Sequence, residues 1–254
     1  MKIPRARTST IAIILLLLPS VAVADPIAKW VAPWSPTKDP LTINSGLGGD
    51  ATAFRDFGDL GDAELLPDTA AKAISRATAD SATFGGGSAT TGVAFNRSFN
   101  LSGSPEGWNV TLSGRLVGLL FAASPTAPSA TVNAGAEIIA GGPVLNWAFA
   151  IAPDRQRSID DAMVGQAILA DGTYNVVGFL RTSASVSASG NPLSTGSAKA
   201  DFASLDPDGF FVGVDATPIP EPATWLLVPT AVGLAWLAHK RRKATKSMHC
   251  PPTA

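Results

Sequence analysis

Short runs of apolar residues, separated by turn signals, fill the chain from Ser81 to Val214 without a long window of helical periodicity. Apolar and small residues alternate within these runs, as in strands that bury one face. The intervening Gly, Pro and Asp residues are typical strand terminators. This pattern predicts an all-β fold, an antiparallel β-sandwich of jelly-roll-like type over residues 81–218. The predicted strand runs are Val93–Phe99, Trp108–Phe121, Ala130–Ala140, Val144–Ile151, Met163–Leu169, Tyr174–Val186 and Phe210–Val214.

Turns are predicted between several of these runs. Gly141-Gly142-Pro143 and Asp206-Pro207-Asp208-Gly209 are turn sequences, and the two aspartates of the second are assigned to turn formation rather than to metal binding. Asp171-Gly172 lies between apolar runs and predicts a β-hairpin. The adjacent acids Asp160 and Asp161 are assigned to a helix cap or an exposed loop.

Residues 25–80 form a separate Pro- and Gly-rich segment. Its first part, up to residue 67, is rich in turn formers, and Trp30 and Trp34 are expected to be buried against the main fold. Residues 68–80 fit either a helical stripe or a strand. The strand is favoured because strand-like sequence follows, and it would place on one face Ala71, Ala73, Ser75, Ala77 and Ala79.

The first 24 residues have the order of a secretory signal peptide. Basic residues precede the apolar run Ile11–Leu18, and Ala22-Val23-Ala24 supplies the small residues of a signal-peptidase site. The apolar run would span only about 12 Å as a helix, which is too short for a permanent anchor. Cleavage is therefore expected before Asp25.

A second apolar segment, residues 223–238, lies near the C-terminus. As a helix it would be about 24 Å long, and a transmembrane helix is expected if flanking basic residues and the bilayer accommodate the short span. A basic cluster follows, which should remain cytoplasmic with the tail 244–254 and stop transfer. That cluster contains Lys240, Arg241, Arg242 and Lys243.

Pro220, Glu221 and Pro222 stand directly before this segment. The order of tripeptide, single span and basic cluster over residues 219–243 resembles the PEP-CTERM sorting signal of Gram-negative bacteria that secrete exopolysaccharide. The resemblance implies recognition by an exosortase, a membrane protease, followed by processing and delivery to the surface. The tail after the cluster is longer than this family's pattern, and the alternative is a plain C-terminal membrane anchor.

Residues 25–219 contain 11 basic and 19 acidic residues, a net charge of −8, which argues against nucleic acid as a partner. His239, His249 and the single cysteine, Cys250, all lie beyond the predicted span. The exported part therefore excludes His- or Cys-based catalytic triads, thiolate or imidazole zinc sites, and disulfides. Its stability must come from a hydrophobic core.

An acidic cluster interleaved with glycines suggests a possible Ca²⁺ site, because calcium prefers oxygen ligands on flexible loops. The spacing does not match an EF-hand, and a solvated turn is the alternative. No other cofactor is expected. The candidate ligands are Asp56, Asp59, Asp62 and Glu64.

Three aromatic residues could form a carbohydrate platform, since a flat ring packs on a sugar face. They are Trp108, Trp147 and Tyr174, and burial in the core is the alternative for each. Glu106 and Glu137 are the only glutamates of the β-region and could serve as the carboxylate pair of a glycoside hydrolase.

Three functions are compatible with these features. The first is an exported, non-enzymatic structural protein of the cell surface or extracellular matrix, associated with exopolysaccharide or biofilm. The second is a carbohydrate-binding surface module, and the third is a glycoside hydrolase. The expected partners are signal peptidase, an exosortase-type protease and exopolysaccharide, and the expected route leads through an inner-membrane intermediate to the surface.

Overall fold

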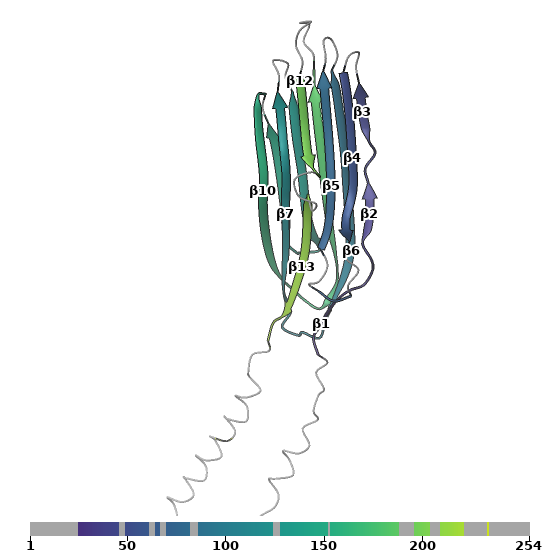
Figure 1. The fold of residues 1–254 in the computed structure, drawn as a ribbon. Helices are drawn as coiled ribbons and strands as arrows, with labels where there is room; N and C mark the ends of the chain where they lie inside the picture. Colours follow the sequence, from purple (N-terminus) through teal and green to yellow (C-terminus); the bar gives the residue numbers. More distant parts are fainter. Residues whose placement is uncertain are drawn as a thin grey trace, which may run out of the picture.

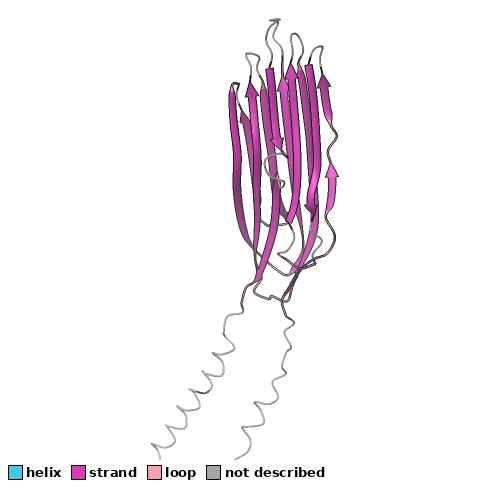
Figure 2. Cartoon of the chain, in the orientation of Figure 1, coloured by secondary structure: helices cyan, strands magenta, loops and turns pink. Residues whose placement is uncertain are grey.

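The computed structural model describes residues 25–45, 49–60, 64–66, 70–81, 86–123, 128–151, 153–187, 196–203, 209–220 and 233. Strands dominate this part of the chain and pair antiparallel in two sheets, which confirms the all-β prediction (Figures 1 and 2). The strands are β1 Ile27–Trp30, β2 Ser35–Lys38, β3 Thr42–Ser45, β4 Gly49–Leu60, β5 Ala70–Ser81, β6 Gly87–Ser102, β7 Trp108–Ala123, β8 Ser129–Ile139, β9 Val144–Ile151, β10 Arg155–Leu169, β11 Gly172–Val186, β12 Gly196–Phe202 and β13 Phe210–Pro218.

The first sheet has the order β1-β6-β11-β8-β9, and β2 and β3 also pair with β6. The three short strands follow one another along the same edge of β6, from Ile27 opposite Ser102 to Ser45 opposite Gly87. They act as one edge strand that is interrupted at Pro33 and Pro40. Proline cannot donate to a ladder, so it is tolerated at such an edge.

The second sheet has the order β4-β5-β12-β7-β10, with β13 beside both β5 and β7. β12 and β13 lie end to end between the same two neighbours, because Phe202 faces Ser75 of β5 and Phe210 faces Ala73. Together they occupy the place of one composite strand, whose two parts are joined by residues 203–209.

Gly209, directly before β13, has a left-handed conformation, with φ +47°. A Cβ atom there would overlap the carbonyl oxygen of Phe202, and only glycine combines this angle with so close an approach. The predicted turn 206–209 therefore lies between β12 and β13, although residues 204–208 are outside the described part of the chain.

The long strands pair in a nested order: β8 with β9, β7 with β10, β6 with β11, and β5 with β12. Alternate pairs belong to different sheets. The predicted hairpin at Asp171-Gly172 is wrong, because β10 and β11 lie in opposite sheets and this turn crosses between them. The turn 141–143 does join two paired strands, β8 and β9.

Residues 27–81 contribute strands to both sheets. The prediction that a separate Pro/Gly-rich segment, 25–80, precedes a sandwich beginning at residue 81 is therefore wrong. Five strands precede β6. The sequence looked turn-rich because prolines lie within or between the short edge strands. Residues 70–81 are a strand, as favoured above. Asp160 and Asp161 lie within β10 rather than in a cap or loop.

Aromatic side chains fill the core toward the end of the sandwich where Ile27 and Pro218 lie, hereafter the near end. Rings from the two sheets meet there, with ring centroids 6.1 Å apart for Phe95 and Phe210 and 5.6 Å for Trp147 and Phe210. Burying such rings supplies most of the favourable energy of a sandwich core. The fully buried aromatic residues are Phe95, Phe99, Trp108, Trp147, Phe202 and Phe210, while Trp30 and Trp34 are 5% and 7% exposed, as expected for these two.

Small side chains form a second core cluster toward the opposite, far end. The sheets approach closely there, because a Cβ at Gly49 of β4 would lie 2.7 Å from the carbonyl oxygen of Gly86, the residue before β6. A small side chain at each inward position permits this approach. The cluster contains Ala51, Ala77, Ala79, Ala89, Ala184, Val186 and Ala198.

A buried hydroxyl pair joins the sheets near the middle of the sandwich. Ser75 of β5 and Thr182 of β11 are 0% and 1% exposed, and their hydroxyl oxygens are 2.7 Å apart. The two residues are 107 positions apart in sequence. The bond therefore ties sequence-distant strands of opposite sheets.

We predict that Ser75→Ala lowers the free energy of unfolding by about 1–3 kcal/mol, because the Thr182 hydroxyl is left buried without its partner. Thr182→Val should have a similar effect. The double variant should cost clearly less than the sum of the two, since it leaves no orphan hydroxyl. Urea unfolding of the four chains measures this cycle, and additive single effects would contradict it.

Candidate functional site

Two of the three residues proposed as a sugar platform are buried, which corrects that expectation. Trp108 and Trp147 are each 1% exposed and present no ring face to solvent. Tyr174 is half-buried, with its ring stacked on Phe99 at a centroid distance of 5.7 Å. Its hydroxyl donates to the carbonyl oxygen of Ala170 at 2.9 Å. Core packing therefore accounts for all three rings.

Two residues of the acidic cluster lie in a strand rather than in the expected flexible loop. Asp56 and Asp59 lie in β4, where the pairing with β5 shifts register between Phe57 and Leu60. The Lys38 ammonium lies 3.1 Å from the Asp56 carboxylate. A hydrogen bond from the Phe57 amide, and then Lys38, holds the pKa of Asp56 below its usual value.

The structure shows little about the other candidate calcium ligands. Glu64 is exposed, while Asp62 and the Asp59 side chain lie outside the described residues. Among the described side chains, no three acidic, His or Cys residues are grouped as metal ligands would be. A calcium site thus remains a sequence-based hypothesis.

Glu106 and Glu137 lie in different parts of the fold. Glu106 is exposed in the turn between β6 and β7, and Glu137 is exposed on β8 of the first sheet. Glu137 lines a shallow groove with Phe179 and Asn146, and Glu106 does not contribute to that groove.

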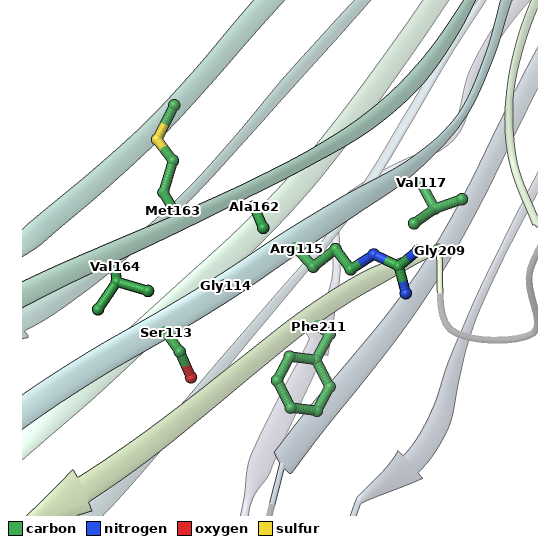
Figure 3. Close-up of a pocket in the computed structure, with 9 residues that line it drawn as sticks. All are labelled: Ser113, Gly114, Arg115, Val117, Ala162, Met163, Val164, Gly209 and Phe211. Carbon is green, nitrogen blue, oxygen red and sulfur yellow. The ribbon is translucent and has the colours of Figure 1, made fainter.

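A more promising site, missed by the sequence analysis, is a groove of about 300 Å³ on the outer face of the second sheet. It lies over β10, β7 and β13, as Figure 3 shows. We call it the outer groove, and the residues that line it are Ser113, Gly114, Arg115, Val117, Ala162, Met163, Val164, Gly209 and Phe211.

Strand register explains why a hollow forms there. Ala162, Arg115 and Phe211 are directly opposite one another on β10, β7 and β13 and form one row. In the neighbouring row, Ser113 stands opposite Gly213, which has no side chain to fill the space beside the phenyl ring. The Phe211 ring is consequently flanked by small residues.

An ion pair bounds the outer groove. The Arg115 guanidinium donates two hydrogen bonds to the Asp160 carboxylate, 2.8 Å from Nε and 3.0 Å from the second nitrogen. These bonds hold the pKa of Asp160 below its usual value. The Arg115 guanidinium, which is held by Asp160, and the Ser113 hydroxyl thus line the groove together with the half-buried Phe211 ring. This combination suits polar ligands with a flat apolar face.

The sequence contained a signal for this groove. In an alternating strand, Phe210 and Phe211 must point to opposite faces, so one ring had to be outside. Arg115, between the apolar stretches of β7, is likewise an outward residue. Their proximity depends on the pairing of β7 with β13, which links positions about a hundred residues apart.

A hydrogen-bond cluster gathers the near end around Asp171, which directly precedes β11. Its carboxylate accepts from the backbone amides of Gly103 and Ser104, at 2.8 and 3.2 Å, and from the Trp108 indole, at 2.8 Å. The Trp108 bond and the two amides hold the pKa of Asp171 below its usual value. The Ile219 amide donates to Gly107 at 3.0 Å, so the end of β13 joins the same turn.

The sorting residues lie at or beyond the limit of the described chain. Pro220 is exposed and ends the stretch that follows β13. Glu221, Pro222, the basic cluster 240–243 and the N-terminal residues 1–24 are outside the described part. In that part no helix has the length and apolar character needed to span a bilayer, and the predicted segment 223–238 falls outside it except for Gly233.

We predict that Asp171→Ala lowers Tm at pH 7 by roughly 2–6 °C, because it leaves the buried Trp108 indole and two amides without their acceptor. A lowered carboxyl pKa contributes stability above the unfolded-state value of about 3.9, and this is lost as the pH falls through the folded-state value. The difference from wild type should therefore shrink below about pH 4. Thermal unfolding across pH, with the exposed Asp215→Ala as control, tests this, and a difference that persists at low pH would contradict the charge-dependent part.

No protein-family model matches the sequence, and no curated protein matches it significantly. A search of solved structures found a distant similarity to the enzymatically active domain of tailspike protein 4 from bacteriophage CBA120, with 12% sequence identity and a TM-score of 0.19. The match covers 73% of this chain and 20% of the tailspike chain, so this chain spans about a fifth of that protein's length. A similarity this distant carries no argument about activity.

Proposed function

We propose that this chain is an exported, non-enzymatic structural protein of the cell surface or extracellular matrix, associated with exopolysaccharide. Its route would use signal peptidase, an inner-membrane intermediate and an exosortase-type protease that recognises Pro220, Glu221 and Pro222. The sequence order from signal peptide to basic cluster supports this route. No sequence relative contributes to the proposal.

One observation supports display of the sandwich in particular: both ends of the sandwich leave from the near end. Ile27 of β1 faces Ser102, and Pro218 of β13 faces Trp108, so the two ends flank the same β6–β7 turn. Figure 1 shows β1 and the end of β13 at the same end of the sandwich. A membrane segment following Pro220 would hold this end, and the far end would point away from the membrane.

The outer face of the first sheet suits a matrix protein. Much of it consists of short polar side chains, beside Glu137, Arg181 and Phe179, and these can make many weak hydrogen bonds to a hydrated polysaccharide. The residues that form this face include Asn96, Ser98, Asn100, Thr131, Asn133, Asn146, Thr173, Asn175 and Ser183.

We predict that Glu221→Ala blocks C-terminal processing and leaves membrane insertion intact, because Glu221 precedes the apolar segment. Wild type should lose the residues after about Pro222, whereas the variant should accumulate as a longer form in the membrane fraction. Replacing Arg241 and Arg242 with Glu should instead disturb orientation. Fractionation in a host that has an exosortase, followed by intact mass, measures both outcomes.

Glu106→Ala is the matched control, since this exposed glutamate lies in a turn of the sandwich. Its processing should equal that of wild type. A wild-type chain that stays full length in membranes would support the plain anchor and end the sorting proposal.

A second candidate function is carbohydrate binding, favoured by the outer groove. The Phe211 ring offers an apolar face, and Arg115 and Ser113, which line the same groove, offer polar groups, with Asp160 paired to Arg115. These elements match the needs of a sugar ring, which is apolar on one face and polar at its edge. This groove replaces the platform of Trp108, Trp147 and Tyr174.

We predict that Phe211→Ala weakens binding to any glycan recognised on an array by on the order of tenfold or more, since the only aromatic surface of the outer groove is removed. Phe54→Ala is the control, because Phe54 is 47% exposed on β4 of the same sheet but outside the groove. Equal loss in both variants, or none in Phe211→Ala, would contradict this assignment.

A further inference from the structure

The two lateral sides of the sandwich differ in how their sheet edges are protected. On one side, the first sheet ends in the proline-interrupted strands β1–β3, and β4 of the second sheet lies next to them. Lys38 of β2 pairs with Asp56 of β4 at 3.1 Å, which bridges the two edges. Short strands, proline and charge are the usual protections against edge-to-edge association.

The opposite side, formed by β9 and β10, has no proline within its strands and carries charge only in the first half of β10. β10 is 15 residues long, contains no proline and pairs with β7 alone among the described strands. The three most exposed large apolar side chains of the described chain all belong to β9 and β10. They are Val144, Val164 and Ile168, with exposed fractions of 64%, 65% and 71%.

The charges of β10 are confined to its first half. Arg155, Arg157, Asp160 and Asp161 occupy positions 155–161, whereas residues 162–170 read Ala-Met-Val-Gly-Gln-Ala-Ile-Leu-Ala and carry no charge. An exposed, uncharged, proline-free strand of this kind favours pairing with another strand. The body of the chain is otherwise acidic, so a neutral edge is the part where two copies can approach with least repulsion.

The segment 162–170 is also complementary to itself. When two copies run antiparallel with Gln166 on the twofold axis, Val164 of each copy stands opposite Ile168 of the other. Both side chains point to the outer face of the second sheet, so the pairing brings the exposed aliphatic residues into cross-strand contact twice. The remaining pairs, Ala162 with Ala170, Met163 with Leu169 and Gly165 with Ala167, carry no charge or polar side chain either.

We propose that the chain forms a twofold homodimer through β10, with residues 162–170 paired antiparallel about Gln166. The backbone groups on the free edge of β10 would then be paired, and the second sheet would continue from one copy into the other. This inference rests on the described strands and does not depend on how the chain is sorted.

Cysteine cross-linking tests the register in the full chain, purified in mild detergent with Cys250→Ser as background. Gln166→Cys should form a disulfide-linked dimer under mild oxidation, because opposed Cα atoms of antiparallel strands lie about 4.5–5.5 Å apart, within disulfide range. Val164→Cys alone should not, since the two copies of residue 164 would be separated by about 14 Å along the strand. Val164→Cys with Ile168→Cys should restore cross-linking.

Sedimentation velocity tests the interface itself. Val164→Lys with Ile168→Lys should weaken the dimer at least about tenfold, because it places charges across the pairing. The control is Leu41→Lys with Ile43→Lys, which alters residues 46% and 47% exposed on the protected side, and its association should equal that of wild type.

Three outcomes would overturn the proposal. The first is a wild-type chain that stays monomeric at all concentrations. A chain whose β10 pairs with a strand of another protein, and not with a second copy, counts as the same outcome. The second is a dimer that the β10 lysines do not weaken, as expected if the segment 223–238 drives association. The third is cross-linking of Val164→Cys alone with none for Gln166→Cys.

Discussion

The alternation of inward and outward side chains along β6, β7 and β11 is the constraint on which the sandwich depends. In β6, every odd-numbered residue from Gly87 to Leu101 is buried, and in β11 the even-numbered residues from Val176 to Val186 are buried. A slip of one residue in either strand would exchange core and surface. The volume of the core, the spacing of the sheets and the outer groove all follow from which residues, odd- or even-numbered, point inward in each strand.

The same alternation produces two cores of different character. Aromatic rings separate the sheets toward the near end, and alanines and glycines let them approach at the far end. The Ser75–Thr182 bond lies between these regions, at the level where large side chains give way to small ones. An enlarged side chain at Ala77 or Ala184 would have no space to occupy, whereas the near end can exchange one large apolar residue for another.

Much of the fold could be predicted from local sequence, because alternation is a local property. The runs from Val93 onward correspond to strands, and the small-residue alternation of 71–79 correctly favoured β5 over a helix. The short strands β1–β3 were missed because each has only four residues and prolines stand within or between them, which reads as a turn-rich segment. Asp160 and Asp161 were misassigned because an edge strand also tolerates charge.

The candidate site was much less predictable, since it depends on pairing between distant segments. Trp108 and Trp147 were natural candidates for a sugar platform, yet strand parity turned both rings inward. Phe211 became a candidate only when the register placed it beside Arg115, with Gly213 opposite Ser113. No local sequence pattern predicts which residues of different strands become neighbours. The inward or outward direction of a single residue, in contrast, follows directly from the alternation.

The central position of β12 and β13 has a consequence for the order in which the fold can form. These strands separate β5 from β7, so without residues 196–218 the second sheet is divided into β4–β5 and β7–β10. The segment that joins the two halves is also the last part of the sandwich to be synthesised. Closure must therefore wait for nearly the whole chain, and the contacts it makes are distant in sequence, which slows folding. A nascent or truncated chain would expose two unpaired interior edges at once, and chaperones that shield strand edges would be needed for as long as that state lasts.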